Sequence, residues 1–153
     1  MIFLLILSKK VICSIEKEGL TVLQMDKKAT RPLYSLVLDG AAFCIENEVD
    51  FVLAIGGGTV MDTAKAIGFF ASNAVDIKDY ALYRKFSPEC LKLGSIVTLA
   101  GTGSEVSATA MIIDDREEPS IKYPLFQDSM RFNFSIMDPS LTYSLPIRHT
   151  LAG

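Results

Sequence analysis

Histidine and cysteine are scarce in this sequence, and their scarcity argues against several kinds of site. The only histidine, His149, cannot build a metal centre alone, because such centres take three or more protein ligands. The three cysteines, Cys13, Cys44 and Cys90, are odd in number and show no CxxC spacing, which favours reduced thiols in a reducing, cytoplasmic compartment. We expect buried, inert thiols, because a nucleophilic cysteine would need the single histidine as its partner.

Basic residues form no patch. Fifteen Lys and Arg residues against 18 Asp and Glu residues give a net charge of −3, and the basic ones are scattered along the chain. A nucleic acid backbone requires a concentrated positive surface. Nucleic acid is therefore not expected as a partner.

Long apolar runs are also absent. The apolar start, residues 1–7, is far shorter than the about 20 residues that cross a bilayer. It has no basic residue before it and no small-residue cleavage site after it, so it does not resemble a signal peptide. We expect no membrane partner, and the start is either a buried strand or the beginning of a helix.

Half of the sequence is hydrophobic, and its apolar runs alternate between two periodicities. Helical spacing over residues 8–18, 33–45 and 59–71 alternates with candidate strands over 21–25 and 51–55. A loop and short helix follow over 73–93, and further strands are expected over 94–99, 108–113 and 132–137. This alternation predicts one α/β domain, a Rossmann-like parallel sheet with flanking helices. We expect one face of the second helix to lie on the sheet: Leu33, Leu36, Val37, Gly40, Ala41, Cys44 and Ile45.

A first glycine segment, Gly56, Gly57 and Gly58, follows the strand over 51–55 and leads into a helix with Thr59 as its expected cap. Glycines there let an anion reach backbone N–H groups at the positive end of the helix, and such turns often require positive φ. A phosphate site and a tight turn without ligand both remain open, because the pattern is neither GxGxxG nor a P-loop. Lys65, inside the helix, is expected to be solvated.

A second small-residue segment, residues 101–104, follows the strand over 94–99. Two such segments at strand ends of one parallel sheet would line the edge where open α/β folds bind ligands. The hydroxyls of Thr98, Thr102 and Ser104 either bind a ribose or phosphate or cap local turns.

Three stretches together carry a family resemblance. Residues 54–67, AIGGGTVMDTAKAI, resemble the GGGSxxDxAKAI motif of iron-containing alcohol dehydrogenases, with Thr59 in place of the serine. Residues 98–106, TLAGTGSEV, are similar to that family's TTAGTGSEV, and residues 136–153 resemble its DPxLT…LP…TaaG stretch. From about Pro32 to the end, the motifs follow the family's order at close to its spacing. Their residues most resemble those of the butanol-dehydrogenase-like branch.

The resemblance implies an NAD(P)-linked interconversion of an alcohol with an aldehyde or ketone, in which a divalent metal, usually iron, polarises the substrate oxygen. It assigns the pyrophosphate to Gly56, Gly57, Gly58 and Thr59, with Asp62 near the cofactor. It assigns the remaining dinucleotide contacts to Thr98, Leu99 and Thr102 at the adenine and ribose, Lys122 at the ribose hydroxyls, and Leu141 beside the dinucleotide.

The sequence differs from the family's pattern in two ways, and both affect what we expect residues 1–153 to do. The family's metal ligands, an aspartate and three histidines, match positions beyond Gly153, and His149 matches none of them. The family's first strand and its second glycine loop, which helps choose between NAD and NADP, have no clear counterpart, since the chain begins at or just before the first helix. We therefore expect a truncated dinucleotide-binding domain without metal ligands or catalytic residues, inactive alone, with exposed apolar surface that favours a homo-oligomer.

Three functions remain open for the chain. It is part of an alcohol dehydrogenase, a module that only binds nucleotides, or a truncated product without function. The substrate and the choice between NAD and NADP cannot be read from these residues.

Overall fold

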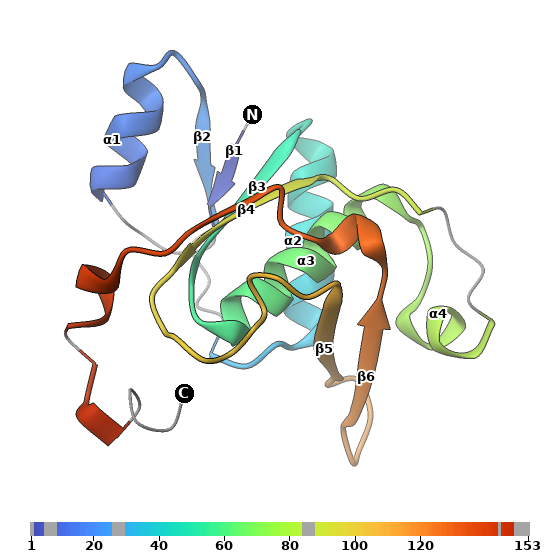
Figure 1. Cartoon of the computed structure of the whole chain (residues 1–153). Coiled ribbons are helices and arrows are strands. Elements are labelled where there is room, and N and C mark those ends of the chain that lie inside the picture. Colours follow the sequence, from blue (N-terminus) through green and yellow to red (C-terminus); the bar gives the residue numbers. More distant parts are fainter. Residues whose placement is uncertain (1, 5–8, 26–29, 84–87, 144, 149–153) are drawn as a thin grey trace.

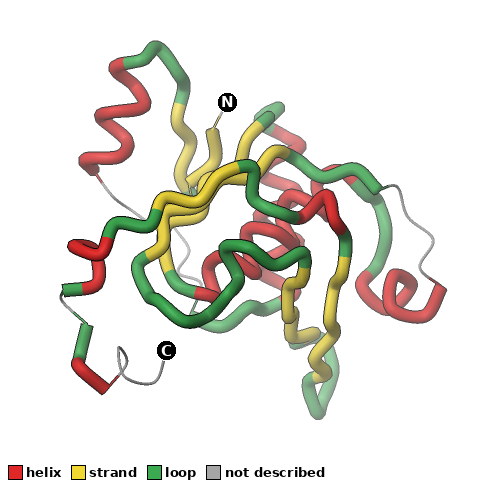
Figure 2. The backbone as a smooth tube through the Cα atoms, viewed as in Figure 1, coloured by secondary structure: helices red, strands yellow, loops and turns green. Residues whose placement is uncertain are grey.

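The computed structural model describes residues 2–4, 9–25, 30–83, 88–143 and 145–148, and it is built around a parallel sheet. The five strands are β1 (Ile2–Leu4), β2 (Val22–Gln24), β3 (Phe51–Gly56), β4 (Lys92–Val97) and β7 (Phe134–Ile136). Their order is β2-β1-β3-β4-β7, and every neighbouring pair is parallel. In Figure 2 the strands are the yellow segments of the tube. Within the apolar start, residues 2–4 form a strand and not the beginning of a helix, and this strand, β1, lies between β2 and β3.

Helices cover both faces of this sheet. The helices are α1 (Lys9–Lys17), α2 (Tyr34–Glu46), α3 (Gly58–Ser72) and α4 (Ile77–Tyr83), and Figure 1 shows α2 and α3 side by side behind β3 and β4. Val52 and Ala54 of β3 belong to the main core with α2 and α3, whereas Leu53 and Ile55 pack with Ile12 of α1. Successive residues of β3 thus belong alternately to two cores, as expected for a sheet that is buried on both faces. The predicted fold class, an α/β fold with a parallel sheet and flanking helices, is confirmed.

An antiparallel hairpin, β5 (Thr109–Asp114) and β6 (Ile121–Phe126), packs against α3 beside the sheet (Figure 1). The strand β5 was expected, but β6 was not. Pro124 stands in the middle of β6, opposite Met111, and a proline inside an apolar run obscures the strand pattern. Two short 3₁₀ helices follow, over Asp128–Met130 and Pro139–Thr142.

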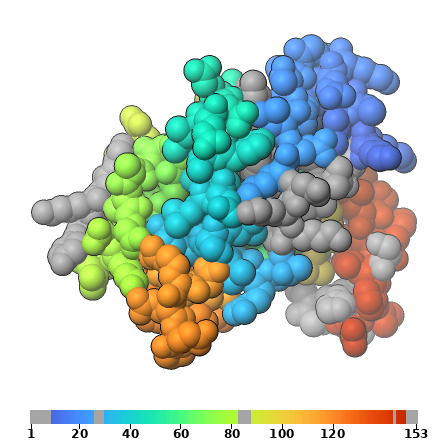
Figure 3. Space-filling view, turned by 180° about the vertical axis from the view of Figure 1, so that it is seen from behind, coloured from blue at the N-terminus to red at the C-terminus, as the bar shows by residue number. Residues whose placement is uncertain are grey.

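Two details of the helices differ from the expectation. Gly57, not Thr59, is the N-cap of α3, because the chain passes from β3 straight into the helix with Gly57 extended at φ −92° and ψ −168°. The face of α2 is buried at Leu36, Val37, Gly40, Ala41 and Cys44 and adjoins α3, but Ile45 is 60% exposed. In the view of Figure 3, α2 runs through the middle of the molecule, above the hairpin.

The cysteines fit the expectation of inert thiols at two of three positions. Cys44 is buried and Cys90 is half-buried, and burial raises the pKa of each thiol to about 12. Both therefore stay protonated at neutral pH. Cys13 is exposed, because it lies on the outer face of α1, so its expected burial is wrong.

The α1 side of the sheet remains partly open. An apolar pocket of about 470 Å³ lies between α1 and β7, lined by Val11, Ile15, Leu20, Asp50, Phe51, Leu53, Ile96, Phe134 and Ile136. This surface agrees with the expected exposed apolar area. A homo-oligomer stays a prediction. Across the described ranges, no helix combines the length and the apolar character that crossing a bilayer would require.

Candidate functional site

The two glycine segments leave the same edge of the sheet. Strands β3 and β4 are parallel with Gly56 opposite Val97, and the N–H of Thr98 donates to the carbonyl of Gly56 at 3.1 Å. The chain adds β2 on one side of β1 and then β3 and β4 on the other side, so the strand order reverses between β1 and β3. In open α/β sheets, ligands bind at such a switch point, beyond the carboxyl ends of the strands.

The first glycine segment places the N-terminus of α3 at this edge. The N–H groups of Val60 and Met61 both bond to the carbonyl of Gly57, each at 3.1 Å. The N–H groups of Gly58 and Thr59 have no hydrogen-bond acceptor among the described residues, as expected for the first turn of a helix. Two free donors at the positive end of a 15-residue helix can bind an anion.

Glycine at positions 57 and 58 allows residues 99–102 to approach the start of α3 closely. A Cβ on Gly57 would lie 3.3 Å from the Cβ of Leu99, and one on Gly58 would lie 3.2 Å from the Cβ of Thr102. Positive φ, which we expected in the first segment, occurs instead in the second, at Gly101 (φ 89°) and Gly103 (φ 68°). The two segments therefore form one surface.

The polar side chains of the second segment bond locally. Thr102 Oγ1 accepts from the N–H of Ser104 at 3.4 Å, which agrees with the local-cap alternative. Ser104 Oγ donates to one carboxylate oxygen of Asp62 at 2.8 Å, and the N–H of Met111 donates to the other at 3.1 Å. Asp62 thus joins α3 to the second segment and to β5. Thr98 and Leu99 are half-buried where the chain leaves β4.

Lys65 is fully buried, so its expected solvation is wrong. Its Nζ donates to the carbonyls of Ser104 (2.6 Å), Ser107 (2.9 Å) and Thr109 (3.0 Å), and to Ser107 Oγ at 3.1 Å. Burial lowers the pKa of Lys65 to about 8, against the opposing effect of Asp62. No clear signal in the sequence indicated this burial, because Asp62 and Lys65 are spaced as neighbours on one face of a helix and could equally have formed a solvated polar face.

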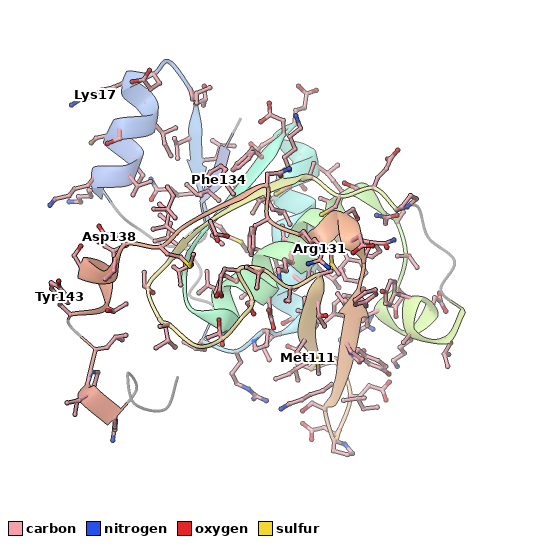
Figure 4. All side chains as sticks on the ribbon, viewed as in Figure 1. Lys17, Met111, Arg131, Phe134, Asp138 and Tyr143 are labelled. Carbon is pink, nitrogen blue, oxygen red and sulfur yellow. The ribbon has the colours of Figure 1, made fainter. Side chains whose placement is uncertain are left out.

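The third motif lies beside the second segment. Strand β7 pairs with β4, and Ser135 Oγ donates to the carbonyl of Glu105 at 3.1 Å. A pocket of about 220 Å³ opens there, lined by Val97, Ala100, Gly101, Glu105, Met137, Asp138, Pro139 and Thr142. Figure 4 shows Asp138 just beyond β7. Leu141, from the 3₁₀ helix at the same edge, is 41% exposed.

The carboxylates of Glu105 and Asp138 in this pocket were not anticipated. Asp138 accepts the N–H of Ser140 at 2.9 Å, and that bonding lowers the pKa of its carboxyl group. Only the pairing of β4 with β7 brings residues so distant in sequence together, so local patterns could not reveal them.

One residue singled out from the sequence, Lys122, is not joined to this edge within the described part of the chain. Lys122 is exposed on β6 opposite Ile113, and no hydrogen bond or ion pair of the described residues links it to either glycine segment. His149 and residues 150–153 lie outside the described residues. Nor does the described part of the chain contain a group of three His, Cys, Asp or Glu side chains able to hold a metal ion.

Comparison with known proteins identifies the family. Residues 3–139 match the sequence profile described as iron-containing alcohol dehydrogenase. The chain belongs to the iron-containing alcohol dehydrogenase family. It is 35% identical over 144 residues to a probable NADH-dependent butanol dehydrogenase of Bacillus subtilis, covering 94% of this chain and 37% of that protein. To an NAD-dependent methanol dehydrogenase of Bacillus methanolicus it is 33% identical, covering 95% and 38%.

Solved structures of other proteins share the fold. The NADH-dependent butanol dehydrogenase A of Thermotoga maritima superimposes with a TM-score of 0.88 at 26% identity, over 99% of this chain and 40% of that one. A sulfoacetaldehyde reductase of Bifidobacterium kashiwanohense, solved in complex with NAD⁺, gives 0.72 at 27% identity, over 97% and 40%. The chain thus spans about two fifths of the length of these relatives.

Proposed function

We propose that residues 1–153 form a dinucleotide-binding domain that holds NAD or NADP at the carboxyl edge of its sheet. The observation that carries the proposal is the pair of free N–H groups of Gly58 and Thr59, with the second glycine segment 3.2 Å from the Gly58 Cβ position. A diphosphate matches this arrangement, because it can accept backbone donors at a helix N-terminus without side-chain obstruction.

The proposed contacts follow from that placement. Gly56, Gly57, Gly58 and Thr59 hold the diphosphate, and Asp62 keeps the neighbouring loop in place beside it. The half-buried Thr98 and Leu99, with Thr102, line the adenosine side. Leu141 packs beside the dinucleotide, and Lys122 approaches a ribose from the hairpin.

We further propose that a complete enzyme with this domain transfers a hydride between NAD(P) and a small alcohol or aldehyde. The relatives named for butanol and methanol support this substrate class. The family's metal would polarise the substrate oxygen. The described residues do not fit that metal, and we assign to them the binding and orientation of the dinucleotide.

Calorimetry with ADP-ribose, NADH and NADPH tests the binding proposal. We expect ADP-ribose and at least one of the two dinucleotides to bind, while adenosine, which lacks the diphosphate, binds much more weakly. This result would also separate a nucleotide-binding module from a product without function. If none of the three diphosphates binds to the folded chain, the proposal is wrong.

A turnover assay tests the distinction between binding and catalysis. With ferrous iron, NAD⁺ and a short primary alcohol, we expect the 153-residue chain to form no NADH above background, because its described residues offer no cluster of metal ligands. The absorbance of NADH measures the rate. Sustained turnover would show that the metal is held by this chain after all.

A further inference from the structure

Two side chains on one face of α3 bind the second half of the loop between β4 and β5 (residues 98–108, hereafter the β4–β5 loop). Asp62 and Lys65 are three residues apart, so they are neighbours on the helix surface. Asp62 holds the hydroxyl of Ser104, and Lys65 holds the carbonyl of the same residue. Lys65 also bonds to Ser107 and Thr109, so the loop is fixed along its second half.

These contacts begin where the glycine segments meet. Gly58 and Lys65 are seven residues apart, which places them on the same side of α3, two turns from each other. Thr102 contacts the Gly58 end, and Ser104 to Thr109 contact the Lys65 end. The β4–β5 loop therefore lies along α3 from the N-terminus of the helix, where the N–H groups of Gly58 and Thr59 are free, to Lys65.

Packing alone does not account for a lysine at this position. An ammonium group has three protons, and four oxygens lie within 3.1 Å of Nζ in a site without solvent exposure. Burying a charge is costly unless it is fully hydrogen-bonded, and an apolar side chain would fill the same space without that cost. The acceptors all belong to the loop or to the first residue of β5, and the loop contains two glycines at positive φ that leave it little stiffness of its own.

We propose that Lys65 and Asp62 are positioning residues that clamp the β4–β5 loop against α3 and thereby set the affinity of the site for the dinucleotide diphosphate. This proposal rests on the dinucleotide-binding function proposed above. Neither side chain needs to touch the ligand. Each acts by holding the second glycine segment beside the N–H groups of Gly58 and Thr59.

The charge of Lys65 makes the clamp sensitive to pH. The charged groups around the ammonium are Asp62 on α3, Glu105 on the loop and Arg131, which donates to the carbonyl of Val106 at 2.6 Å and is labelled in Figure 4. The ring of Phe132 lies 5.3 Å from Nζ. With a pKa of about 8, the amine loses its proton just above neutrality, and the neutral form has one donor fewer and no positive potential. An anionic ligand favours the protonated form, so its affinity is highest below pH 8 and falls as the pH rises through that value.

Calorimetry with ADP-ribose between pH 7 and pH 9.5 tests the clamp. For the Lys65→Met chain we expect affinity about 10-fold weaker at pH 7, the size of effect that loss of one charge-assisted hydrogen bond produces. We also expect the Lys65→Met chain to lose the fall in affinity above pH 8 that the unchanged chain shows. Lys78→Met, which removes an exposed lysine from α4, is the matched control and should behave like the unchanged chain. A folded Lys65→Met chain with unchanged affinity and pH profile would overturn the proposal.

Amide hydrogen exchange tests the clamp without any ligand. We expect exchange over residues 102–108 to be about 10-fold faster in Lys65→Met than in the unchanged chain or in Lys78→Met. Asp62→Asn, which keeps the lysine and the shape of the helix, should loosen the same residues and serves if Lys65→Met does not fold. Equal protection in the folded variants would refute the clamp. If the unchanged chain binds no ADP-ribose, the dinucleotide function fails, and the exchange result still decides whether the clamp exists.

Discussion

Replacing Gly58 by aspartate is expected to weaken ADP-ribose binding by about 100-fold or more, while the chain stays folded. The new carboxylate would stand in the first turn of α3, where it competes for the free N–H groups and repels the diphosphate. The same position is favourable for a negative side chain in the unbound helix, because of the helix dipole. Calorimetry measures the affinity, and thermal unfolding measures the stability.

Gly58→Ala separates the effect of charge from that of size. An alanine Cβ would lie 3.2 Å from the Cβ of Thr102, so the second segment must shift by a few tenths of an ångström. We expect a loss of affinity well below that of the aspartate. If Gly58→Asp binds ADP-ribose as tightly as the unchanged chain, the diphosphate does not lie at the start of α3.

Replacing Arg116 by methionine is expected to lower the free energy of unfolding by about 2–3 kcal/mol, less than the roughly 3–5 kcal/mol for a fully buried pair. Arg116 binds the fully buried carboxylate of Asp114 through Nε and Nη2, both at 2.8 Å, and binds Asp76 at 2.7 Å. Its guanidinium also lies 4.6 Å from the centre of the Tyr34 ring. Without it, Asp114 is a buried charge with no cation bonded to it, although the 38% exposure of the Arg116 side chain admits some water.

The pKa shifts of Asp114 and Asp76 determine how the stability lost in Arg116→Met depends on pH. Arg116 holds the pKa of Asp114 and of Asp76 below the ordinary value of 3.8. The stabilisation is therefore complete above that value and is lost as the pH falls through the lowered pKa of the folded state. The difference between the unchanged chain and Arg116→Met should be largest at neutral pH and shrink below pH 4, as urea unfolding at several pH values can measure.

An exposed ion pair in the same region is the control. The side chains of Lys78 and Glu117 are 38% and 44% exposed, so Lys78→Met should lower the free energy of unfolding much less than Arg116→Met does. Equal losses for Arg116→Met and Lys78→Met would mean that the burial of Asp114 has no energetic consequence.

The fold was largely predictable because its central elements carry unambiguous patterns. A continuous apolar strand, a glycine turn and an apolar helix identified β3 and α3, and helical spacing identified α1 and α2. The strand β6 was missed because Pro124 interrupts it, and Thr59 was mistaken for the cap because sequence cannot show how sharply β3 turns into α3.

The site was predictable in part. Periodicity placed the two glycine segments at one edge, and the parallel pairing of β3 and β4 bears this out. Individual contacts came only from the family resemblance, and they remain a proposal. Lys65 was misjudged because a lysine is usually solvated, whereas here the backbone carbonyls of a distant loop surround it. Such long-range contacts do not appear in any local pattern of residues.

Titration of the ¹⁵N-labelled chain with ADP-ribose, followed through backbone amide signals, tests the central claim most directly. If the diphosphate binds to the start of α3, the largest shifts occur at Gly58 and Thr59, with further shifts across residues 101–104, and they saturate together. Saturable binding that leaves the Gly58 and Thr59 amides unchanged and shifts residues elsewhere would contradict this account.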